Sequence, residues 1–336
     1  MPRSFSIIIP TLNRAGLLRD TLESVARVVP PKAPVEIIVV DNGSIDKTRD
    51  AFNTVSEKYR DTEWKYFYES MPGLLSGRHR GAAEARGEVL CYLDDDVLLA
   101  PSWLDAIEDA FRDPTVALVG GPSRPSFLAE PPDWLPALWW NDDEGQGCTW
   151  LSLIDSGPYI KLIDHGWVWG LNFSIRKDVF YSCGGFHPDY VPKPLQRFQG
   201  DGETGLALKA KDRGGAALYH PAAAVTHVIP ASRLTPKAFA ERAFYCGVCD
   251  SYTEIRRERQ VSAAPQPGWK DILRPLKCRL EKLVRQRDAD EVQRLIGRAY
   301  VAGMQFHKSE VLKDPQLLGW VLKENYFDYS LPEGAK

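Results

Sequence analysis

The sequence has no long uncharged apolar segment and no strong excess of either charge. Its 336 residues carry a formal net charge of −3, with acidic and basic side chains interspersed, so the composition gives no support to nucleic-acid binding. No segment approaches the roughly 20 consecutive apolar residues that a membrane-spanning helix needs. These absences favour a globular protein without a transmembrane segment and without a polyanionic partner.

Cysteine is scarce, and the N-terminus lacks the features of a targeting segment. Six cysteines in a chain of this length are more typical of a reduced protein than of a disulfide scaffold. The chain enters a strand-like run directly, without the apolar region of a signal peptide. We therefore expect a cytoplasmic protein, and the composition leaves peripheral contact with a membrane open.

Cys246 and Cys249 have a CxxC spacing, but no second pair of cysteines accompanies them. A zinc site would therefore lack ligands. The surrounding residues 239–252 have a helical pattern, and a spacing of three on a helix is typical of core packing. We expect these two thiols to pack in the core.

Strand-like runs and helical patterns alternate through the first 120 residues. The run 35–40 (VEIIVV) is continuously apolar, as expected for a parallel strand that is covered on both faces. The alternating order predicts an open, mostly parallel α/β sheet with helices on both faces. The expected strands are 5–10, 35–40, 64–69, 89–93 and 116–120, and the expected helices are 15–28, 48–57, 73–86 and 103–111.

The amino-acid composition and the hydrophobic pattern change after residue 120. Proline and tryptophan cluster between residues 121 and 169, which predicts an irregular insert covering one edge of the sheet. From residue 236 the pattern is helical. Between these segments the expected elements are strands 170–176, 216–219 and 223–227 and a helix over 203–212.

Three adjacent carboxylates, Asp94, Asp95 and Asp96, directly follow the buried strand 89–93. Ligands of parallel α/β sheets bind beyond the carboxyl ends of the strands. Asp94 and Asp96 can converge, because alternate residues of an extended chain point to the same side. Carboxylate oxygens suit Mg²⁺ or Mn²⁺, both of which bridge to phosphates. The alternative is a solvated acidic loop.

Several segments, in the same order along the chain, match the pattern of one family. The match extends from about residue 5 to about residue 250, and its strength lies in the ordered set. Taken together, these segments resemble the family 2 glycosyltransferases, which have the GT-A fold. The segments are 9–14 (IPTLNR), 39–44 (VVDNGS), 73–96 (GLLSGRHRGAAEARGEVLCYLDDD), 170–176 (GLNFSIR) and 184–186 (GGF).

The resemblance implies a GT-A-type, mostly parallel sheet flanked by helices, with a helical C-terminal extension. It divides the chain into a nucleotide-sugar-binding half, an acceptor-binding and catalytic half, and a helical C-terminal region. The boundaries we expect for these three parts are 1–121, 122–230 and 231–336.

The resemblance also assigns contacts to a nucleotide-sugar donor. Asp41 would accept hydrogen bonds from the base, although an aspartate in this sequence context also forms simple turns. Arg78 would hold the diphosphate or its ribose, Asp94 would face the ribose and sugar, and Asp96 would hold the metal ion, Mn²⁺ or Mg²⁺. The residues expected to bind the donor are Pro10, Thr11, Asn13, Arg14, Asp41, Arg78, Asp94 and Asp95.

The segment expected to carry the general base departs from the family pattern. The family has Glu-Asp-x-Glu-Leu there, and its aspartate is the base. Alignment on Leu206 puts Glu203 at the base position, with Gly202 and Gly205 in place of the flanking acids. Asp201 is the second candidate. The alternative is that these residues only begin the helix, since acidic side chains are favoured in its first turn.

Three further expectations concern the metal and the acceptor. His227 follows a short strand and could ligate Mn²⁺ through a neutral imidazole, or it could be a buried, hydrogen-bonded histidine. Trp167 and Trp169 could stack on a sugar ring of the acceptor, or they could anchor the insert. Asn172 is a further candidate for acceptor binding. Where this chain has His79, the family commonly has asparagine.

The function predicted on this basis is inverting transfer of a sugar, with a UDP-sugar donor favoured. The acceptor could be a saccharide, a lipid-linked saccharide, a small molecule or a peptide. A sugar nucleotidyltransferase is one alternative, but such enzymes need a glycine-rich phosphate loop after the first strand, and here no glycine precedes Gly16. A non-catalytic nucleotide-sugar-binding protein is the other alternative.

Overall fold

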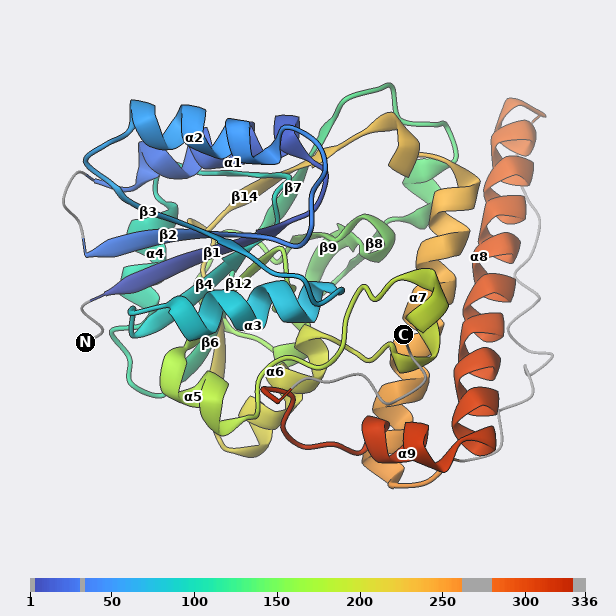
Figure 1. Cartoon of the computed structure of the whole chain (residues 1–336). Coiled ribbons are helices and arrows are strands. Elements are labelled where there is room, and N and C mark those ends of the chain that lie inside the picture. The colour runs from blue at the N-terminus through green and yellow to red at the C-terminus, as the bar shows by residue number, and fades with distance from the viewer. Residues whose placement is uncertain (1–3, 31–33, 262–279, 329–336) are drawn as a thin grey trace.

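The computed structural model describes residues 4–30, 34–261 and 280–328. These residues form two sheets with helices around them (Figure 1). The larger sheet has eight strands in the order β11-β13-β6-β12-β4-β1-β2-β3. Their bounds are β1 (Phe5–Thr11), β2 (Val35–Asp41), β3 (Glu63–Tyr68), β4 (Val89–Leu93), β6 (Val116–Gly120), β11 (Lys161–Leu162), β12 (Asn172–Arg176) and β13 (Ala216–Tyr219).

The larger sheet is mostly parallel, as predicted. Strands β3, β2, β1 and β4 run parallel to one another, and β13 runs parallel to β6. Strand β12 is antiparallel to both of its neighbours, β4 and β6. The residues of β1, β2 and β4 are all buried, because helices cover both faces of the sheet.

Two hydrophobic cores lie on the two faces of this sheet. One core contains side chains of α1, α2 and α4, and the other contains side chains of α3, α5 and α6. The bounds of the helices are α1 (Ala15–Val28), α2 (Thr48–Lys58), α3 (Leu74–Glu84), α4 (Trp103–Ala110), α5 (Lys177–Ser182) and α6 (Glu203–Asp212).

Helix α3 lies close to the sheet, because glycines form the side of the helix that contacts the sheet. A Cβ atom on Gly81 would stand 2.3 Å from Cγ2 of Ile8, and one on Gly77 would stand 3.1 Å from Cβ of Pro10. Side chains larger than hydrogen would lift the helix away from β1. This close contact fixes the position of Arg78, which follows Gly77 on the helix.

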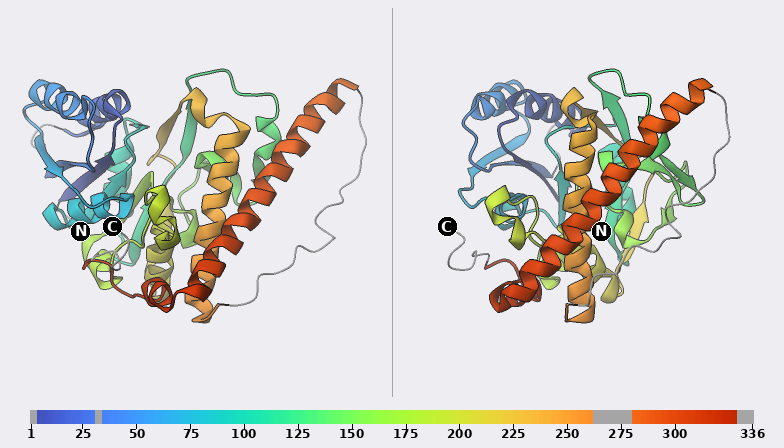
Figure 2. Two further views of the ribbon diagram at one scale, coloured as in Figure 1. Left: turned by 45° about the vertical axis from the view of Figure 1, so that its right-hand side comes forward. Right: turned by 90° about the vertical axis from the view of Figure 1, so that its right-hand side faces the viewer.

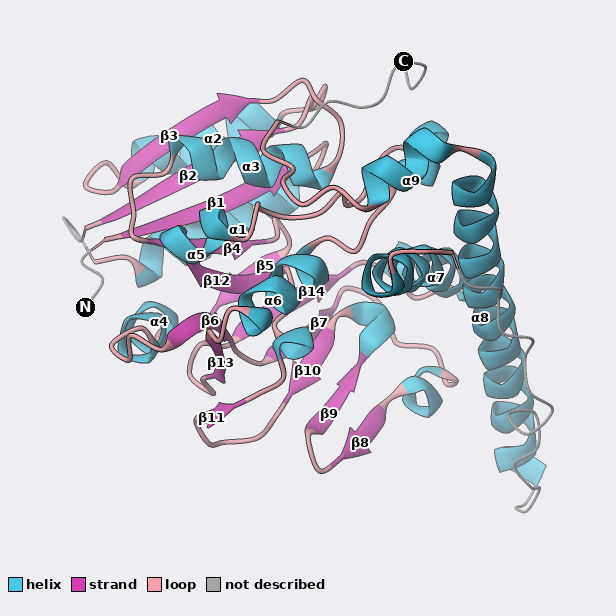
Figure 3. Ribbon diagram, turned by 90° about the horizontal axis from the view of Figure 1, so that it is seen from below, coloured by secondary structure: helices cyan, strands magenta, loops and turns pink. Residues whose placement is uncertain are grey.

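The second sheet has six strands in the order β5-β14-β7-β10-β9-β8, and Figure 3 shows it beside the larger sheet. The expectation of a wholly irregular insert over residues 121–169 is wrong, since most of these strands lie in it. Each of them has only three to five residues, too few for a periodic pattern. The bounds are β5 (Val97–Leu99), β7 (Ser123–Phe127), β8 (Trp140–Asp142), β9 (Gly145–Cys148), β10 (Leu153–Asp155) and β14 (Val225–Ile229).

Short 3₁₀ helices connect several of these strands. They are formed by three to six residues each. Their bounds are η1 (Leu135–Leu138), η2 (Thr149–Leu151), η3 (His165–Trp167), η4 (Lys193–Phe198) and η5 (Ala231–Arg233).

The C-terminal part is helical, as predicted, and consists of α7 (Pro236–Glu258), α8 (Leu280–Lys313) and α9 (Pro315–Val321). Helix α8 crosses α7 in Figure 2. At the crossing, a Cβ atom on Gly247 would stand 2.1 Å from the carbonyl oxygen of Tyr300, and one on Gly303 would stand 2.0 Å from that of Phe244. The two backbones are therefore in direct contact.

Within residues 4–30, 34–261 and 280–328, no helix is long and apolar enough to cross a membrane. The five cysteines in these ranges are free thiols. Cys246 and Cys249 lie on α7, where the Cys249 thiol donates a hydrogen bond to the carbonyl oxygen of Gly200 over 3.0 Å. Burial raises the pKa of both thiols.

Candidate active site

The carboxyl ends of β1, β2 and β4 meet at one edge of the larger sheet. Strand β1 ends at Thr11, β2 ends at Asp41, and the acidic triplet follows Leu93 at the end of β4. Because the three strands are parallel neighbours, these segments come together although they lie far apart in the sequence. Backbone turns, carboxylates and guanidinium groups therefore lie together at this edge.

Arg14 connects the turn after β1 to the acidic triplet. Its Nη1 atom lies 2.9 Å from Oδ1 of Asp95 and 2.8 Å from Oδ2 of Asp96. The hydroxyl of Thr11 donates a hydrogen bond of 2.7 Å to the other oxygen of Asp95. Burial, together with the charge of Asp96, raises the pKa of Asp95 to about 6 in spite of Arg14.

His227 of β14 lies opposite Asp96. Its Nδ1 atom is 2.9 Å from the carbonyl oxygen of Leu151, and a carbonyl can only accept, so Nδ1 carries a proton. Nε2 lies 2.9 Å from Nη1 of Arg233. A guanidinium group has no acceptor atom, so Nε2 accepts this hydrogen bond with its lone pair and the imidazole is neutral.

One oxygen of Asp96 has no hydrogen bond among the residues that the structure describes. This atom, Oδ1, is buried and lies 3.5 Å from Nε2 of His227. Burial works against the charge of Asp96, but the guanidinium groups of Arg14 and Arg233 lower its pKa. An ionised oxygen of Asp96 therefore lies close to an imidazole nitrogen that accepts a hydrogen bond from Arg233. Within the described part of the chain, no group of three or more His, Cys, Asp or Glu side chains is arranged to hold a metal ion.

Arg78 of α3 is fully buried among three carboxylates. Nη2 lies 3.6 Å from Oδ1 of Asp94, and Nη1 lies 3.3 Å from Oε2 of Glu203 and 3.6 Å from Oδ2 of Asp189. Gly170 leaves room for the guanidinium group, since a Cβ atom there would stand 2.3 Å from Nη2. Burial raises the pKa of Asp94.

The two candidates for the base have different environments. Glu203 is the first residue of α6, and its side chain is 23% exposed. Its Oε1 atom accepts a hydrogen bond of 3.0 Å from the amide of Gly170. Asp201 is buried, and its two oxygens contact Nδ1 of His187 at 2.6 Å and the hydroxyl of Thr253 at 2.7 Å. Only Glu203 is presented at the edge of the sheet.

The turns after β1 and β2 are hydrogen-bonded to each other. Asn13 adopts a left-handed conformation (φ 55°), which asparagine tolerates. Its amide donates to the hydroxyl of Ser44, and its side-chain oxygen accepts from the amide of Ile45, both over 2.8 Å. Asp41 accepts hydrogen bonds from the amide of Ser44 (2.7 Å) and from the hydroxyl of Tyr66 (2.5 Å).

The predicted acceptor residues divide into two groups. Trp167 and Trp169 are half-buried neighbours with ring centroids 6.0 Å apart, and Trp140 of β8 extends this row, 5.1 Å from Trp167. Asn172, in contrast, is buried. Its side-chain oxygen accepts from the indole of Trp103 over 3.0 Å, and its amide nitrogen donates to a backbone carbonyl over 2.8 Å.

His79 lies in the core. Its Nε2 atom accepts a hydrogen bond of 2.9 Å from the amide of Phe186, and the ring packs against Phe180 and Phe327. Burial lowers the pKa of this imidazole to about 3. Where the family commonly has asparagine, this chain therefore has a neutral, structural histidine.

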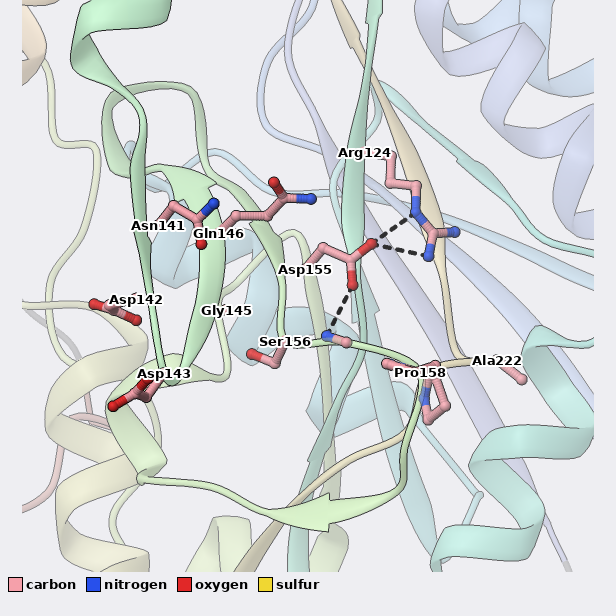
Figure 4. Close-up of a pocket in the computed structure, with 12 residues that line it drawn as sticks. Arg124, Asn141, Asp142, Asp143, Gly145, Gln146, Asp155, Ser156, Pro158 and Ala222 are labelled. Atoms are coloured by element: carbon pink, nitrogen blue, oxygen red, sulfur yellow. Dashed lines mark hydrogen bonds and ion pairs between the residues drawn. The ribbon is translucent and has the colours of Figure 1, made fainter.

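A hollow of about 780 Å³ lies over the second sheet and is shown in Figure 4. Arg124 and Asp155 form an ion pair in it, with Nη2 and Oδ2 3.0 Å apart. In the ladder between β7 and β14, Arg124 pairs with Thr226 and Pro125 pairs with His227. Successive side chains of a strand point to opposite faces, so the hollow and His227 lie on opposite faces of the second sheet. The hollow is separate from the carboxylate cluster.

Sequence reasoning missed two residues at the edge of the larger sheet and its surroundings, Arg233 and Asp189, and it did not single out Trp140 among the clustered tryptophans. Arg233 lies shortly after the end of the strand that carries His227, and Asp189 lies shortly after the Gly-Gly-Phe turn. Their positions relative to the predicted motifs were visible, but their contacts depend on the packing of β14, α6 and β8.

The comparisons with known proteins agree with this architecture. The pattern of the family described as glycosyl transferase family 2 matches residues 6–180, more than half of the chain. The chain belongs to this family, and so to the glycosyltransferases rather than the sugar nucleotidyltransferases.

Two relatives and one solved structure illustrate the range of similarity. The chain is 30% identical over 206 residues to validoxylamine A glucosyltransferase from Streptomyces hygroscopicus subsp. jinggangensis, a match that covers 55% of this chain and 47% of the relative. It therefore spans about half the length of that protein. It is 23% identical over 301 residues to glucosyl-dolichyl phosphate glucuronosyltransferase from Haloferax volcanii, covering 87% of this chain and 90% of the relative.

The solved structure is a mannosyltransferase from Pyrobaculum calidifontis in complex with GDP-Man and Mn²⁺. It superposes with a TM-score of 0.54 at 19% identity, over 98% of this chain and 88% of that chain. The similarity establishes a shared GT-A-type fold, as the sequence predicted.

Proposed function

We propose that this chain transfers a sugar from a nucleotide-diphosphate sugar to a hydroxyl group of an acceptor, by direct displacement with inversion at the anomeric carbon. Membership of the family supports sugar transfer. The neighbouring turns after β1, β2 and β4 support a donor site, because ligands of such sheets bind beyond the carboxyl ends of the strands.

The observation that carries the proposal is the pair of facing, electron-rich atoms on Asp96 and His227. Oδ1 of Asp96 is buried and has no hydrogen bond within the described ranges. Nε2 of His227 lies 3.5 Å away, and Arg233, whose hydrogen bond it accepts, would have to move aside for a cation to bind. An oxygen and a nitrogen of this kind fit Mn²⁺, whereas Mg²⁺ prefers oxygen ligands and would be held by Asp96 alone. Such ions are commonly held by only one or two carboxylates plus substrate phosphates, which agrees with the small number of side chains here. When bound, the cation would neutralise charge on the departing diphosphate.

We assign donor binding to the residues around the acidic triplet. Asp41 is buried at the end of β2, where its carboxylate suits an N–H group of the base, and we favour a UDP-sugar. Arg78 would bind the diphosphate or ribose, and Asp94 would face the sugar. The remaining proposed donor contacts are Pro10, Thr11, Asn13, Arg14 and Asp95. The Pyrobaculum enzyme was crystallised with GDP-Man and Mn²⁺, so a test needs both uridine and guanosine donors.

Glu203 is our proposed general base. It would take the proton of the acceptor hydroxyl while the acceptor oxygen bonds to the anomeric carbon and the bond from that carbon to the diphosphate oxygen breaks. Gly170 and Arg78 would orient the carboxylate through the contacts described above. Asp201 is left out of this role, because both of its oxygens contact buried partners.

On the acceptor side we propose contacts with Trp167, Trp169 and Trp140. Aromatic rings offer large apolar surface with a polar edge, which suits the apolar face of a sugar ring. Asn172 is left out, because its side-chain amide is used in the core. A sugar-containing acceptor, either free or lipid-linked, agrees best with this row of indoles.

The test measures donor binding and turnover. Thermal shifts are recorded with UDP, GDP, dTDP and CDP, each with and without Mn²⁺, and hydrolysis of the matching nucleotide sugar is then followed. We expect a metal-dependent stabilisation that is lost in Asp96→Ala and kept in the surface control Asp61→Asn. Unchanged binding in Asp96→Ala would contradict the site. Binding without any release of nucleoside diphosphate would favour the non-catalytic alternative.

A further inference from the structure

The start of α6 lacks the two flanking acids of the family pattern, and other segments fill the space. Gly202 has φ 54°, and a Cβ atom on it would stand 2.7 Å from Oδ2 of Asp189. A Cβ atom on Gly205 would stand 2.0 Å from Nδ1 of His187 and 2.5 Å from Oδ1 of Asp201. Where the family has side chains of α6, this chain therefore has carboxylates that come from outside the helix.

Asp189 is held in place from several directions. Its Oδ1 atom accepts hydrogen bonds from the amide of Tyr190 (3.0 Å), from the side chain of Gln199 (3.3 Å) and from the hydroxyl of Tyr245 on α7. Its backbone carbonyl accepts a bond of 3.0 Å from the amide of Leu74, the first residue of α3. Asp189 is thus tied both to the helix that carries Arg78 and to the C-terminal helices.

The other carboxylate oxygen of Asp189, Oδ2, faces Nη1 of Arg78. Glu203, the proposed base, faces the same nitrogen. Nη1 of Arg78 lies 3.6 Å from Oδ2 of Asp189 and 3.3 Å from Oε2 of Glu203. Neither contact has the 2.7–2.9 Å length of a strong charge-assisted hydrogen bond, so one cation is shared between two carboxylates.

Burial, together with the charge of Glu203, raises the pKa of Asp189 to about 7. The charged and titratable groups that face it are Arg78 from α3, Glu203 from α6, and Arg242, Tyr245, Cys246 and Cys249 from α7.

We propose that Asp189 is a positioning residue for the transfer reaction: it competes with Glu203 for Arg78 and so keeps the Glu203 carboxylate available as a base. This inference rests on the role that we propose for Glu203. An ionised Asp189 draws Arg78 away from Glu203 and adds a negative charge beside it, and both effects raise the proton affinity of Glu203. With asparagine, a neutral residue of the same shape, at position 189, Arg78 would remain paired with Glu203.

The first experiment needs no activity. The carboxyl groups of the intact protein are labelled with ¹³C-aspartate and titrated by NMR, and the Asp189 resonance is assigned by its loss in Asp189→Asn. We expect its midpoint near pH 7, a fall of about one pH unit in Glu203→Gln because a neighbouring charge is removed, and a rise in Tyr245→Phe because a hydrogen-bond donor is removed.

The control is Asp250→Asn, which breaks a comparable pair on the same helix, since Asp250 accepts a 2.5 Å hydrogen bond from Tyr300. The Asp189 midpoint should not move in this variant. An unchanged midpoint in Glu203→Gln, or a midpoint in the ordinary range for aspartate, would overturn the proposal.

The second experiment follows the pH dependence of metal-dependent hydrolysis of UDP-glucose or GDP-mannose. We expect kcat to rise through a step near pH 7 that Asp189→Asn lacks, with kcat at high pH reduced about tenfold and the donor KM changed less than kcat. A purely structural role would lower Tm and leave the step in place. Full turnover in Glu203→Gln would instead contradict the proposed role of Glu203 as the base. The NMR titration of Asp189 does not depend on that role, so the two failures can be told apart.

Discussion

Asp96 and His227 meet across the junction of the two sheets, with Oδ1 and Nε2 3.5 Å apart. The backbone makes the same connection, because the amide of Val228 donates a 2.8 Å hydrogen bond to the carbonyl oxygen of Asp96. The second sheet therefore supplies a side chain that the turn after β4 could not supply itself.

The first prediction concerns metal affinity. His227→Ala should weaken Mn²⁺ binding by about tenfold or more, since even loss of an outer-shell partner of a metal ligand costs 10–100-fold. Mn²⁺ titration in the presence of nucleoside diphosphate, followed by electron paramagnetic resonance, measures this. His165→Ala is a matched control, because that buried imidazole contacts the carbonyl oxygen of Gly215 over 2.7 Å and lies outside the carboxylate cluster. Equal Mn²⁺ affinity in His227→Ala and the parent would contradict a ligand role.

The second prediction concerns the room that Gly170 leaves for Arg78. Gly170→Ala places a Cβ atom 2.3 Å from Nη2, so the guanidinium group must move away from its three carboxylates. We expect turnover to fall by about 100-fold, as for other misplacements near the reacting atoms. Gly16→Ala is the control, since its new methyl group meets nothing within 4 Å. Comparable losses in both variants would point to a general effect on folding.

The third prediction separates Asp201 from the base. Burial works against the charge of Asp201, but His187 and Thr253 lower its pKa. Asp201→Asn removes the charge that strengthens the hydrogen bonds from His187 and Thr253 and should cost about 2 kcal/mol of stability. Urea unfolding measures the free energy of unfolding. Turnover of the variant that is still folded should remain within a few-fold of the parent. A selective loss of turnover without loss of stability would return Asp201 to the list of candidate bases.

The fourth prediction concerns acid. Burial lowers the pKa of His79 to about 3 and also lowers the pKa of His187. Both imidazoles take up protons more readily in the unfolded chain, so their effect on stability is constant above the ordinary histidine pKa of about 6.5 and becomes destabilising as the pH falls below it. Tm should therefore fall steadily from pH 7 toward pH 4. In His79→Asn the fall should be shallower, and an equal slope would contradict this account.

The fifth prediction concerns the indole row. Trp167→Ala should raise the acceptor KM by about tenfold, the size expected for one aromatic contact, and should leave donor hydrolysis unchanged. Trp150→Ala is the control, because this half-buried indole packs in the cluster with Leu151 and Phe239 instead. Acceptor kinetics after a screen of glycosides measure the effect. Loss of donor hydrolysis in Trp167→Ala would indicate that the row only supports the fold.

The first half of the fold was predictable because its strands are long and continuously apolar. The predicted and observed limits of α1 and β4 coincide, since buried runs and helical spacing define both elements. The second sheet was not predictable. Its strands have three to five residues, and the pairing of several of them is decided by neighbours distant in sequence.

The candidate site was predictable only where a motif carries the chemistry locally. The triplet at Asp94 and the turn at Asn13 could be recognised in this way. The sequence could not indicate that Asn172 and Asp201 use their side chains on buried partners. Nor could it place Asp189 beside Arg78, because that contact follows from the packing of the segment around Asp189 against the start of α3.

The glycines that let α3 rest on β1 have a consequence for how this enzyme can vary. A methyl group at residue 81 would collide with Ile8 and displace the whole helix, and with it the single guanidinium that touches Asp94 on one side and Glu203 on the other. Recognition of the leaving group and activation of the incoming hydroxyl would then deteriorate together. Evolution or engineering of a new donor preference is therefore more accessible through the turns at residues 11–14 and 41–46 than through this helix.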